Sequence, residues 1–599
     1  MPLVHDDLRQ KTEISRGLTA HPRRRARAHS RPTSEQPGTS PIDMPSRPAY
    51  APAAMRAIVL QVIVLICFVA APAGAEPPVQ TDEGVSPQSF LTLGHSGYFR
   101  FRADMFLNGD LGNGSGGLQA PIHTLSQNQG HGEDSRLLSS ANIRMRWRPE
   151  LRIGQRLRIG TVIDVLDNVV LGSSPDYAAS RPDAPFLFLS DSQISAVDTI
   201  RVKQVWAEWD ILHTLLLRVG RMGDHFGLGM VNNDGECVDC DFGDTPDRAW
   251  LRIRAMGFHS DWFFDSPAEG VTSQSALQPF GQATDLTDLD DVYRWGFTLG
   301  YMPVDEAERE EEARALGRGD VVLNGVLKNT FTDQDSTSAA QSGETCTADG
   351  SPQNRTFDCT ALRPRGASYW VPDLWVKLLW RPTYQMLFRA ELELAATYGE
   401  VGFTQNIDTP ASDKDFLAFG GVLQLELQHE KLSYELEVGF ATGDDVAYGP
   451  YGSSFVAPDE TYASDLDGRL QSNRRIERFL FHRDYHVDLL LYREVIGAVT
   501  NTVYVKPSVT AHLLKSSEQV LGATLSVLYG HALERESTPG REAPLGVESD
   551  LTIFFEVPGI GRADFETGIL VPLGAFRNLA TGEEPGLAYA FQARITMTF

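Results

Sequence analysis

Charged side chains recur at every second position in several segments, and their sign changes along the chain. If these side chains face one interior, a basic wall stands opposite an acidic wall. The resulting transverse field orients dipolar solutes and water. The expected pore-lining residues are Arg100, Arg102, Arg144, Arg146, Arg148, Arg152, Arg158, Arg218, Arg252 and Arg254, opposite Glu391, Glu393, Glu426, Glu435 and Glu437. The acidic wall continues with Glu548, Asp550, Glu556, Asp564 and Glu566.

The same residues allow two hypotheses about the interior. In the first, the interior is solvated, and the charged walls select what passes through. In the second, arginine and glutamate side chains pair across the interior as a structural network that closes it.

The elements that position these charges are β-strands with one apolar and one polar face. The clearest is the end of the chain, residues 586–599, where apolar side chains occupy alternate positions. They are Leu587, Tyr589, Phe591, Ala593, Ile595, Met597 and Phe599. This length suits a tilted strand that crosses a bilayer, which takes about 9 to 11 residues.

Strands of the same kind recur from residue 97 onward, at 97–106, 141–153, 293–301, 386–394, 417–427, 432–440 and 547–555. Short turns alternate with long polar loops, as in outer-membrane barrels with tight periplasmic turns. The fold class is therefore predicted as all-β, a large antiparallel transmembrane β-barrel. The best count is 18 strands within a range of 16 to 20, because one strand or two fit residues 257–264 and 474–501. One solvated periplasmic helix is expected over residues 305–316.

Two segments resemble known outer-membrane proteins. The terminal strand, which ends on Phe599, resembles the closing strand that bacterial barrels present to their barrel-assembly machinery. The runs 202–209 and 217–230, with Arg218-Val219-Gly220-Arg221 and a glycine-rich loop, are similar to the alginate-export and phosphate-selective porin groups. This resemblance implies a channel or exporter for hydrophilic, anionic solutes. The acidic wall and the loop cysteines depart from that pattern. The alternative is a closed structural or adhesive barrel that acts through its external loops.

Composition and targeting agree with export to the bacterial outer membrane. The chain has 599 residues and a net charge of −26, which argues against nucleic-acid binding. Residues 55–75 have the order of a signal peptide, with cleavage expected after Ala75. We expect residues 1–54 to be a disordered or wrongly assigned start, 76–94 a periplasmic segment, and 95–599 the barrel. The barrel exterior would contact outer-membrane lipid.

Four cysteines remain after cleavage. An even number in an exported protein predicts disulfides, here between Cys237 and Cys240 and between Cys346 and Cys359. Zinc binding is the weaker reading, because no second CxxC motif is present. A redox role for the CxxC is weaker again, because no βαβ pattern surrounds it.

No catalytic motif was found, and we expect neither an enzyme nor a cofactor. The histidines that could serve a hydrolase, His225, His259 and His486, are interpreted as ordinary surface residues. Calcium could bind in acidic loops, although solvated loop charge explains the same residues. These are Asp285, Asp288, Asp290, Asp291, Asp444 and Asp445, and the run Asn232, Asn233, Asp234, Gly235 and Glu236.

Overall fold

The computed structural model describes residues 90–109, 111, 137–170, 200–212, 214–255, 257–268, 291–340, 360–401, 414–444, 475–579 and 582–599. All of them belong to one compact unit, Val85–Phe599. Cys346, Cys359, the signal segment and most of the expected loops lie outside the described residues. Within these ranges, no helix has the length and apolar composition to cross a bilayer.

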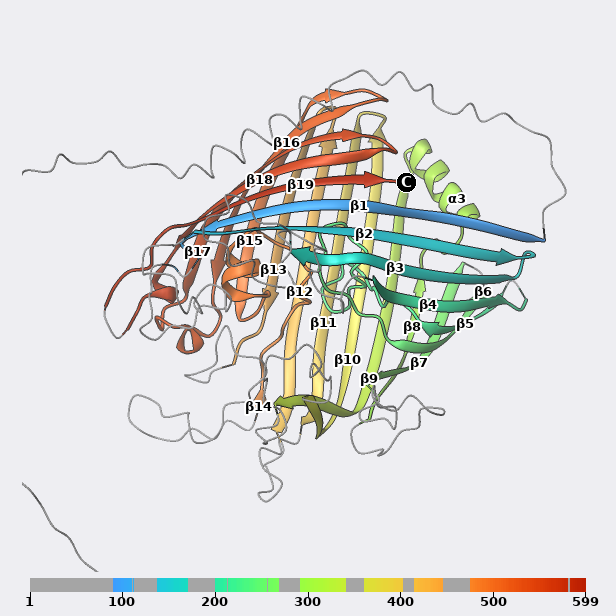
Figure 1. The fold of residues 1–599 in the computed structure, drawn as a ribbon, viewed down its shortest axis with the longest axis horizontal. Coiled ribbons are helices and arrows are strands. Elements are labelled where there is room, and N and C mark those ends of the chain that lie inside the picture. The colour runs from blue at the N-terminus through green and yellow to red at the C-terminus, as the bar shows by residue number, and fades with distance from the viewer. Residues whose placement is uncertain are drawn as a thin grey trace, which may run out of the picture. The chain divides into compact units, whose positions relative to one another are not determined.

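The described residues form one closed β-barrel (Figure 1). Of its 19 strands, β14 has two residues and pairs in parallel with β12, which leaves 18 antiparallel barrel strands. β1 pairs with β2 on one side and with β19 on the other, so the sheet has no free edge. The strands are β1 (Leu91–Leu107), β2 (Leu137–Ile153), β3 (Leu157–Val170), β4 (Ile200–Asp210), β5 (Leu215–Arg221), β6 (Asp247–Ala255), β7 (Phe258–Ala268), β8 (Val292–Tyr301), β9 (Val321–Ala340), β10 (Thr360–Thr383), β11 (Met386–Val401), β12 (Lys414–His429), β13 (Leu432–Ala441), β14 (Arg475–Ile476), β15 (Thr502–Lys515), β16 (Val520–His531), β17 (Pro544–Val557), β18 (Gly561–Pro572) and β19 (Ala588–Thr598).

Alternation along each strand separates the two faces of the barrel wall. In β2, Arg144 and Arg146 are buried inside the barrel, whereas Met145 and Trp147 are exposed outside. The outer face presents apolar side chains all round the barrel, among them Trp262, Leu299, Leu436, Leu525, Leu551, Phe565 and Met597. A closed barrel with an apolar exterior and a charged interior is the arrangement of a transmembrane β-barrel. The predicted fold class and the best strand count are confirmed.

The two ends of the barrel differ in the length of their connections. Both chain ends of the barrel lie at the end with short turns, such as Tyr384–Gln385 between β10 and β11 and Glu430–Lys431 between β12 and β13. The helix α3 (Glu306–Arg318) joins β8 to β9 at this end, as predicted. Asp305 caps it by accepting a hydrogen bond from the backbone N–H of Glu308.

The structure gives the number of strands in the two regions, residues 257–264 and 474–501, where the sequence left it open. Residues 258–268 form the single strand β7. Residues 475–501 add no strand to the barrel wall, although one or two strands were expected there. Apart from the two-residue β14 they contain a π-helix, η2 (Leu491–Ile496), inside the barrel. Their apolar residues pack as a compact core, so the alternation that suggested a strand has another cause.

A lipid-facing charge tests the sidedness of the wall. Leu551 lies mid-strand in β17 on the outer face. We expect Leu551→Arg to lower the free energy of unfolding by about 2 to 4 kcal/mol, the cost of arginine at the bilayer midplane. Ile560→Arg, in the exposed turn between β17 and β18, is the control and should change it by less than about 1 kcal/mol. Urea unfolding in lipid vesicles measures both, and equal effects would contradict the assigned outer face.

Candidate functional site

The loop of residues 222–246 between β5 and β6 folds into the lumen, and we call it the strap. Its middle lies against the inward faces of β1 and β2. Arg100 donates to the carbonyl oxygen of Val238 at 2.8 Å, and Arg146 donates to that of Gly235 at 2.6 Å. Both arginines are almost completely buried. A buried guanidinium group requires hydrogen-bond acceptors, and the backbone carbonyl groups of the strap supply them to the wall.

Asp239 is the point on the strap where the most cationic groups meet. Arg102 of β1 reaches its carboxylate at 3.3 Å, and Arg594 of β19 reaches it at 2.7 Å. From residues 475–501, Arg493 approaches at 2.7 Å and His486 at 3.5 Å. Burial alone would raise the pKa of Asp239, but these neighbours, Arg493 foremost, hold it well below its usual range. Asp239 therefore stays ionised and joins three parts of the barrel.

The strap is also held on the opposite side of the lumen. Glu393 of β11 accepts a hydrogen bond from the backbone N–H of Leu228. At the start of the strap, Asp224 is buried among three cations of the wall, at 2.8 to 3.0 Å, which are Arg248, Arg294 and Lys328. Burial alone would raise the pKa of Asp224, but these cations hold it well below its usual range. Carboxylates of the strap thus meet cations of the wall, while its backbone N–H groups meet a wall carboxylate.

Residues 475–501 form a second inward segment, which we call the plug. Glu548 of β17 accepts three hydrogen bonds from consecutive backbone N–H groups of the plug, those of Leu489, Leu490 and Leu491, at 3.0, 2.8 and 2.7 Å. The plug also packs its own apolar side chains against inward residues of β15 to β19. This core includes Phe479, Phe481, Leu491, Val495, Leu528, Leu545 and Leu570. The plug is therefore a packed element of the barrel interior.

Strap and plug contact each other near the middle of the lumen. The carboxylate of Asp484 accepts hydrogen bonds from the backbone N–H groups of Asp241 at 3.0 Å and Phe242 at 2.6 Å. Arg483 lies over the ring of Phe242, with 4.5 Å between the guanidinium carbon and the ring centroid. Together the two segments span the lumen from the basic wall to the acidic wall.

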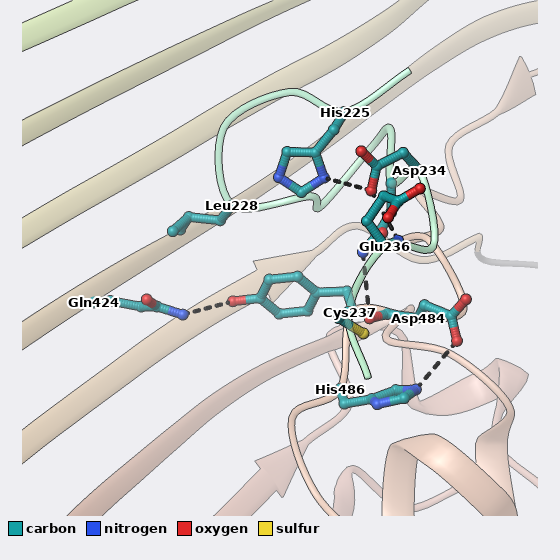
Figure 2. A pocket seen from close by; sticks show the side chains of 10 residues that line it. His225, Leu228, Asp234, Glu236, Cys237, Gln424, Asp484 and His486 are labelled. Carbon is teal, nitrogen blue, oxygen red and sulfur yellow. Dashed lines mark hydrogen bonds and ion pairs between the residues drawn. The ribbon is translucent and has the colours of Figure 1, made fainter. Parts of the chain in front are cut away.

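A cavity of about 540 Å³ lies between strap and plug (Figure 2). His225, Asp234 and Glu236 line it from the strap, and Asp484 and His486 line it from the plug. Gln424 of β12 closes one side, where it donates to the hydroxyl of Tyr485 at 3.2 Å. Its lining includes three carboxylates and no arginine or lysine.

A second cavity, of about 630 Å³, lies at the end of the barrel with short turns. Its lining includes Trp250, the first turn of α3 and six arginines, Arg152, Arg158, Arg218, Arg252, Arg254 and Arg309. The side chains of Arg152 and Arg158 are 60% and 41% exposed. Arg218 lies between two indole rings, 4.4 Å from the centroid of Trp206 and 5.2 Å from that of Trp250. This stacking fixes the plane of its guanidinium group.

The sequence-predicted arginines therefore occupy two environments. Arg100, Arg102, Arg144 and Arg146 are buried against the strap, while those nearer the short turns border the second cavity. Five of the ten, Arg144, Arg146, Arg158, Arg218 and Arg252, also bind a carboxylate on a neighbouring strand. Arg146 forms a bidentate pair with Asp164 at 2.7 and 2.8 Å, and Arg252 one with Asp261 at 2.7 Å for each bond. Arg148 binds Glu236 of the strap.

The sequence-predicted glutamates also have different kinds of partner, a cation of the wall for some and hydroxyl groups for another. Arg389, an inward cation of β11 that the sequence analysis passed over, binds Glu391 at 2.9 Å and Glu426 at 2.8 Å, with Glu435 at 3.8 Å. Glu437 accepts hydrogen bonds from hydroxyl groups, that of Tyr504 at 2.7 Å and that of Tyr485 of the plug at 3.0 Å. The carboxylates lie opposite the arginines, and the strap and plug lie between the two sets.

Two further groups of predicted site residues can be placed. Cys237 and Cys240 form a disulfide in the strap. Among the acidic residues considered for calcium, Asp285, Asp288, Asp290 and Asp445 lie outside the described residues. Within the described ranges, no group of three or more His, Cys, Asp or Glu side chains is arranged to hold a metal ion. His259 is buried in β7 and His486 lies between two aspartates, so the surface interpretation of these histidines is wrong.

The closed wall, the apolar exterior and the charged interior spanned by inward loops decide the class. The chain is a transmembrane β-barrel of 18 antiparallel strands. No family model matches it, and no curated protein matches it either. Many solved structures are similar to it, and three of them serve as examples. OccK11 (OpdR) of Pseudomonas aeruginosa has a TM-score of 0.41 and 10% sequence identity, and the match covers 84% of this chain and 95% of that chain. OccK9 (OpdG) of the same species has a TM-score of 0.44 and 10% identity, with coverage of 85% of this chain and 98% of that chain. OccAB2 of Acinetobacter baumannii has a TM-score of 0.39 and 10% identity, with coverage of 84% of this chain and 98% of that chain.

The sequence analysis missed the residues that link the two walls. Asp239, Asp241, Asp484 and Arg493 were assigned to no site, because charged loop residues are usually solvated. A usable signal was present in residues 479–496, where an apolar composition does not fit an external loop. The strap contains several carboxylates, and β1 and β2, earlier in the chain, are rich in inward arginines. The opposite charges of these segments were a second signal.

The contact between plug and strap should depend on pH through His486. Burial and the nearby Arg493 lower the pKa of His486, but hydrogen bonds to Asp239 and Asp484 outweigh them and raise it above 6.5. Its stabilising contribution is therefore complete below about pH 6.5 and is lost as pH rises through the raised value. We expect amide-exchange protection factors of residues 237–242 to fall across this range.

The same protection factors, corrected for intrinsic exchange, should be independent of this titration in His486→Gln. His512→Gln is the matched control, because His512 lies at the short-turn end, where it contacts Lys431. An unchanged pH profile in His486→Gln would contradict this role.

Proposed function

We propose that the protein is an outer-membrane channel that passes hydrophilic solutes, anionic ones in particular, along the arginines of its lumen. The cavity at the short-turn end carries this proposal. Several of its arginine side chains are partly exposed, and two indole rings together with Glu208 hold Arg218 in place. A guanidinium group has five N–H donors, so an arginine that binds one wall carboxylate can still contact a carboxylate or phosphate group of a solute.

In this proposal the strap and the plug act as the selectivity element between the two ends. A solute in the arginine-lined cavity next meets Arg148, whose partner Glu236 also lines the central cavity. The environment therefore changes from basic to acidic within the length of the strap. Such a path favours solutes that can exchange one set of charged contacts for another.

A second candidate function is a closed barrel that acts through its external loops. The observation in its favour is the number of ion pairs and apolar contacts by which strap and plug fill the lumen. Buried arginines such as Arg144, whose side chain is 1% exposed, are then structural, and no solute reaches them. The two candidates differ in whether the folded protein conducts ions.

Conductance in planar bilayers separates these functions. We expect steady single-channel conductance and an anion-selective reversal potential in a salt gradient. Arg152→Gln and Arg218→Gln together should reduce the anion preference, because each removes a positive charge from the arginine-lined cavity. Arg158 still pairs with Glu208 after the loss of Arg218, which protects the fold. Arg318→Gln is the control, because it removes an exposed charge from α3 outside this cavity.

Conductance without any anion preference would leave a channel but refute the role of the arginines. A folded barrel that never conducts would favour the closed structural barrel instead.

We also propose that the barrel-assembly machinery reads the terminal strand through Phe599. The ring of Phe599 is half exposed, and its backbone pairs with that of Gly97 in β1. We expect deletion of Phe599 to lower the amount of folded barrel in the outer membrane, measured by heat-modifiable migration in gels. Refolding into detergent is the control, since no machinery is present and the yield should change little. Equal losses in both systems would indicate a purely structural role.

A further inference from the structure

The disulfide between Cys237 and Cys240 closes a four-residue turn at the centre of the strap. Many polar contacts of the strap with the basic wall and the plug converge on this turn or on Asp241, the residue after it. Arg144 donates to the carbonyl oxygen of Cys240 at 2.5 Å, Arg100 donates to that of Val238, and Asp239 carries four cationic contacts. We call residues 237–240 the clip.

The two cysteines differ in exposure. Cys240 is completely buried against the basic wall, whereas Cys237 is exposed and lines the central cavity (Figure 2). A small molecule that enters this cavity therefore meets the sulfur of Cys237 first. The clip is also the only disulfide among the described residues, and it lies at the joint between strap, plug and wall.

We propose that the Cys237–Cys240 disulfide is an exchange site for small-molecule thiols, and that its reduction loosens the strap from the plug and the basic wall. The proposal rests on the channel function proposed above, because it assigns control of that channel to the strap. The wall arginines need acceptors in fixed places, and the disulfide limits the conformations in which the turn can present them.

The exchange reaction has two steps. The thiolate of the small molecule attacks the sulfur of Cys237, the S–S electron pair moves to the sulfur of Cys240, and that thiolate takes up a proton. A second thiolate then attacks the sulfur of the small molecule in the mixed disulfide. It releases the oxidised small-molecule disulfide and leaves Cys237 as a thiolate, which is also protonated. The protein gains two electrons and two protons, and the small thiols supply both.

The consequence is a more mobile turn. Without the S–S bond, the carbonyl groups of Val238 and Cys240 and the carboxylate of Asp239 no longer hold one arrangement relative to one another. The backbone N–H groups of Asp241 and Phe242, now bound to Asp484, then exchange with solvent more readily. We expect a displaced strap to open a connection between the two cavities.

The test applies dithiothreitol to the full-length protein purified from outer membranes, with thiol alkylation and mass spectrometry to show which cysteines are reduced. Two readouts are followed, single-channel conductance and amide exchange of residues 237–242. We expect reduction to raise the conductance and to accelerate exchange of these amides by roughly tenfold or more, the scale that a short closed loop implies. Exchange does not depend on conduction, so it separates this proposal from the channel function.

Two variants serve as matched controls. Cys346→Ser with Cys359→Ser keeps the clip and should respond to dithiothreitol as the unaltered protein does. Cys237→Ser with Cys240→Ser should have the conductance and exchange of the reduced protein without any thiol, and should not respond to it. If the latter variant does not fold, reduction of the unaltered barrel, with its heat-modifiable migration retained, gives the answer alone.

Each outcome decides one question. Faster exchange with higher conductance supports both proposals. Faster exchange in a barrel that conducts in neither state supports the clip and overturns the channel function. Unchanged exchange and conductance after complete reduction of Cys237 and Cys240 overturn the clip.

Discussion

The interior of this barrel depends on the cost of burying arginine. β1 and β2 direct Arg100, Arg102, Arg144 and Arg146 inward, where all four are buried. An unpaired charge in such a place costs several kcal/mol, so partners are obligatory. Neighbouring strands and the strap supply them, and the strap carbonyls and Asp239 are therefore drawn to this wall. The inward course of the strap follows from the charges of the wall.

The plug is held by a different balance of forces. Its backbone N–H groups converge on Glu548, while its apolar side chains extend a core onto the inward faces of β15 to β19. Apolar burial makes this element a fixed one, whereas the strap is held mainly by ion pairs and hydrogen bonds. The two segments differ in how they respond to solvent conditions, since pH and thiols act on polar and covalent links and leave an apolar core unchanged.

Local periodicity was enough to predict the barrel but not its interior. Alternation as in residues 586–599 identifies a strand and its outer face, because lipid imposes that pattern on each strand separately. The single strand at 258–268 and the plug at 475–501 were ambiguous, since short apolar runs fit several structures. The pairing of Asp239 with Arg493 joins positions 254 residues apart, and no local pattern encodes such a contact. The two opposed walls could be predicted from the alternation of side chains along the strands. The strap and the plug between them could be recognised only in the three-dimensional structure.

The pairing of β1 with β19 determines when the barrel can close during synthesis. Gln592 donates to Asp104 across it, between residues separated by 488 positions, and Phe599 exchanges backbone hydrogen bonds with Gly97. β19 thus closes the cylinder by pairing with β1, so closure cannot precede the synthesis of β19. Until then the first strand keeps an unpaired edge, which is open to wrong partners. A nascent chain of this protein needs protection for the whole time between emergence of its first strand and arrival of its last.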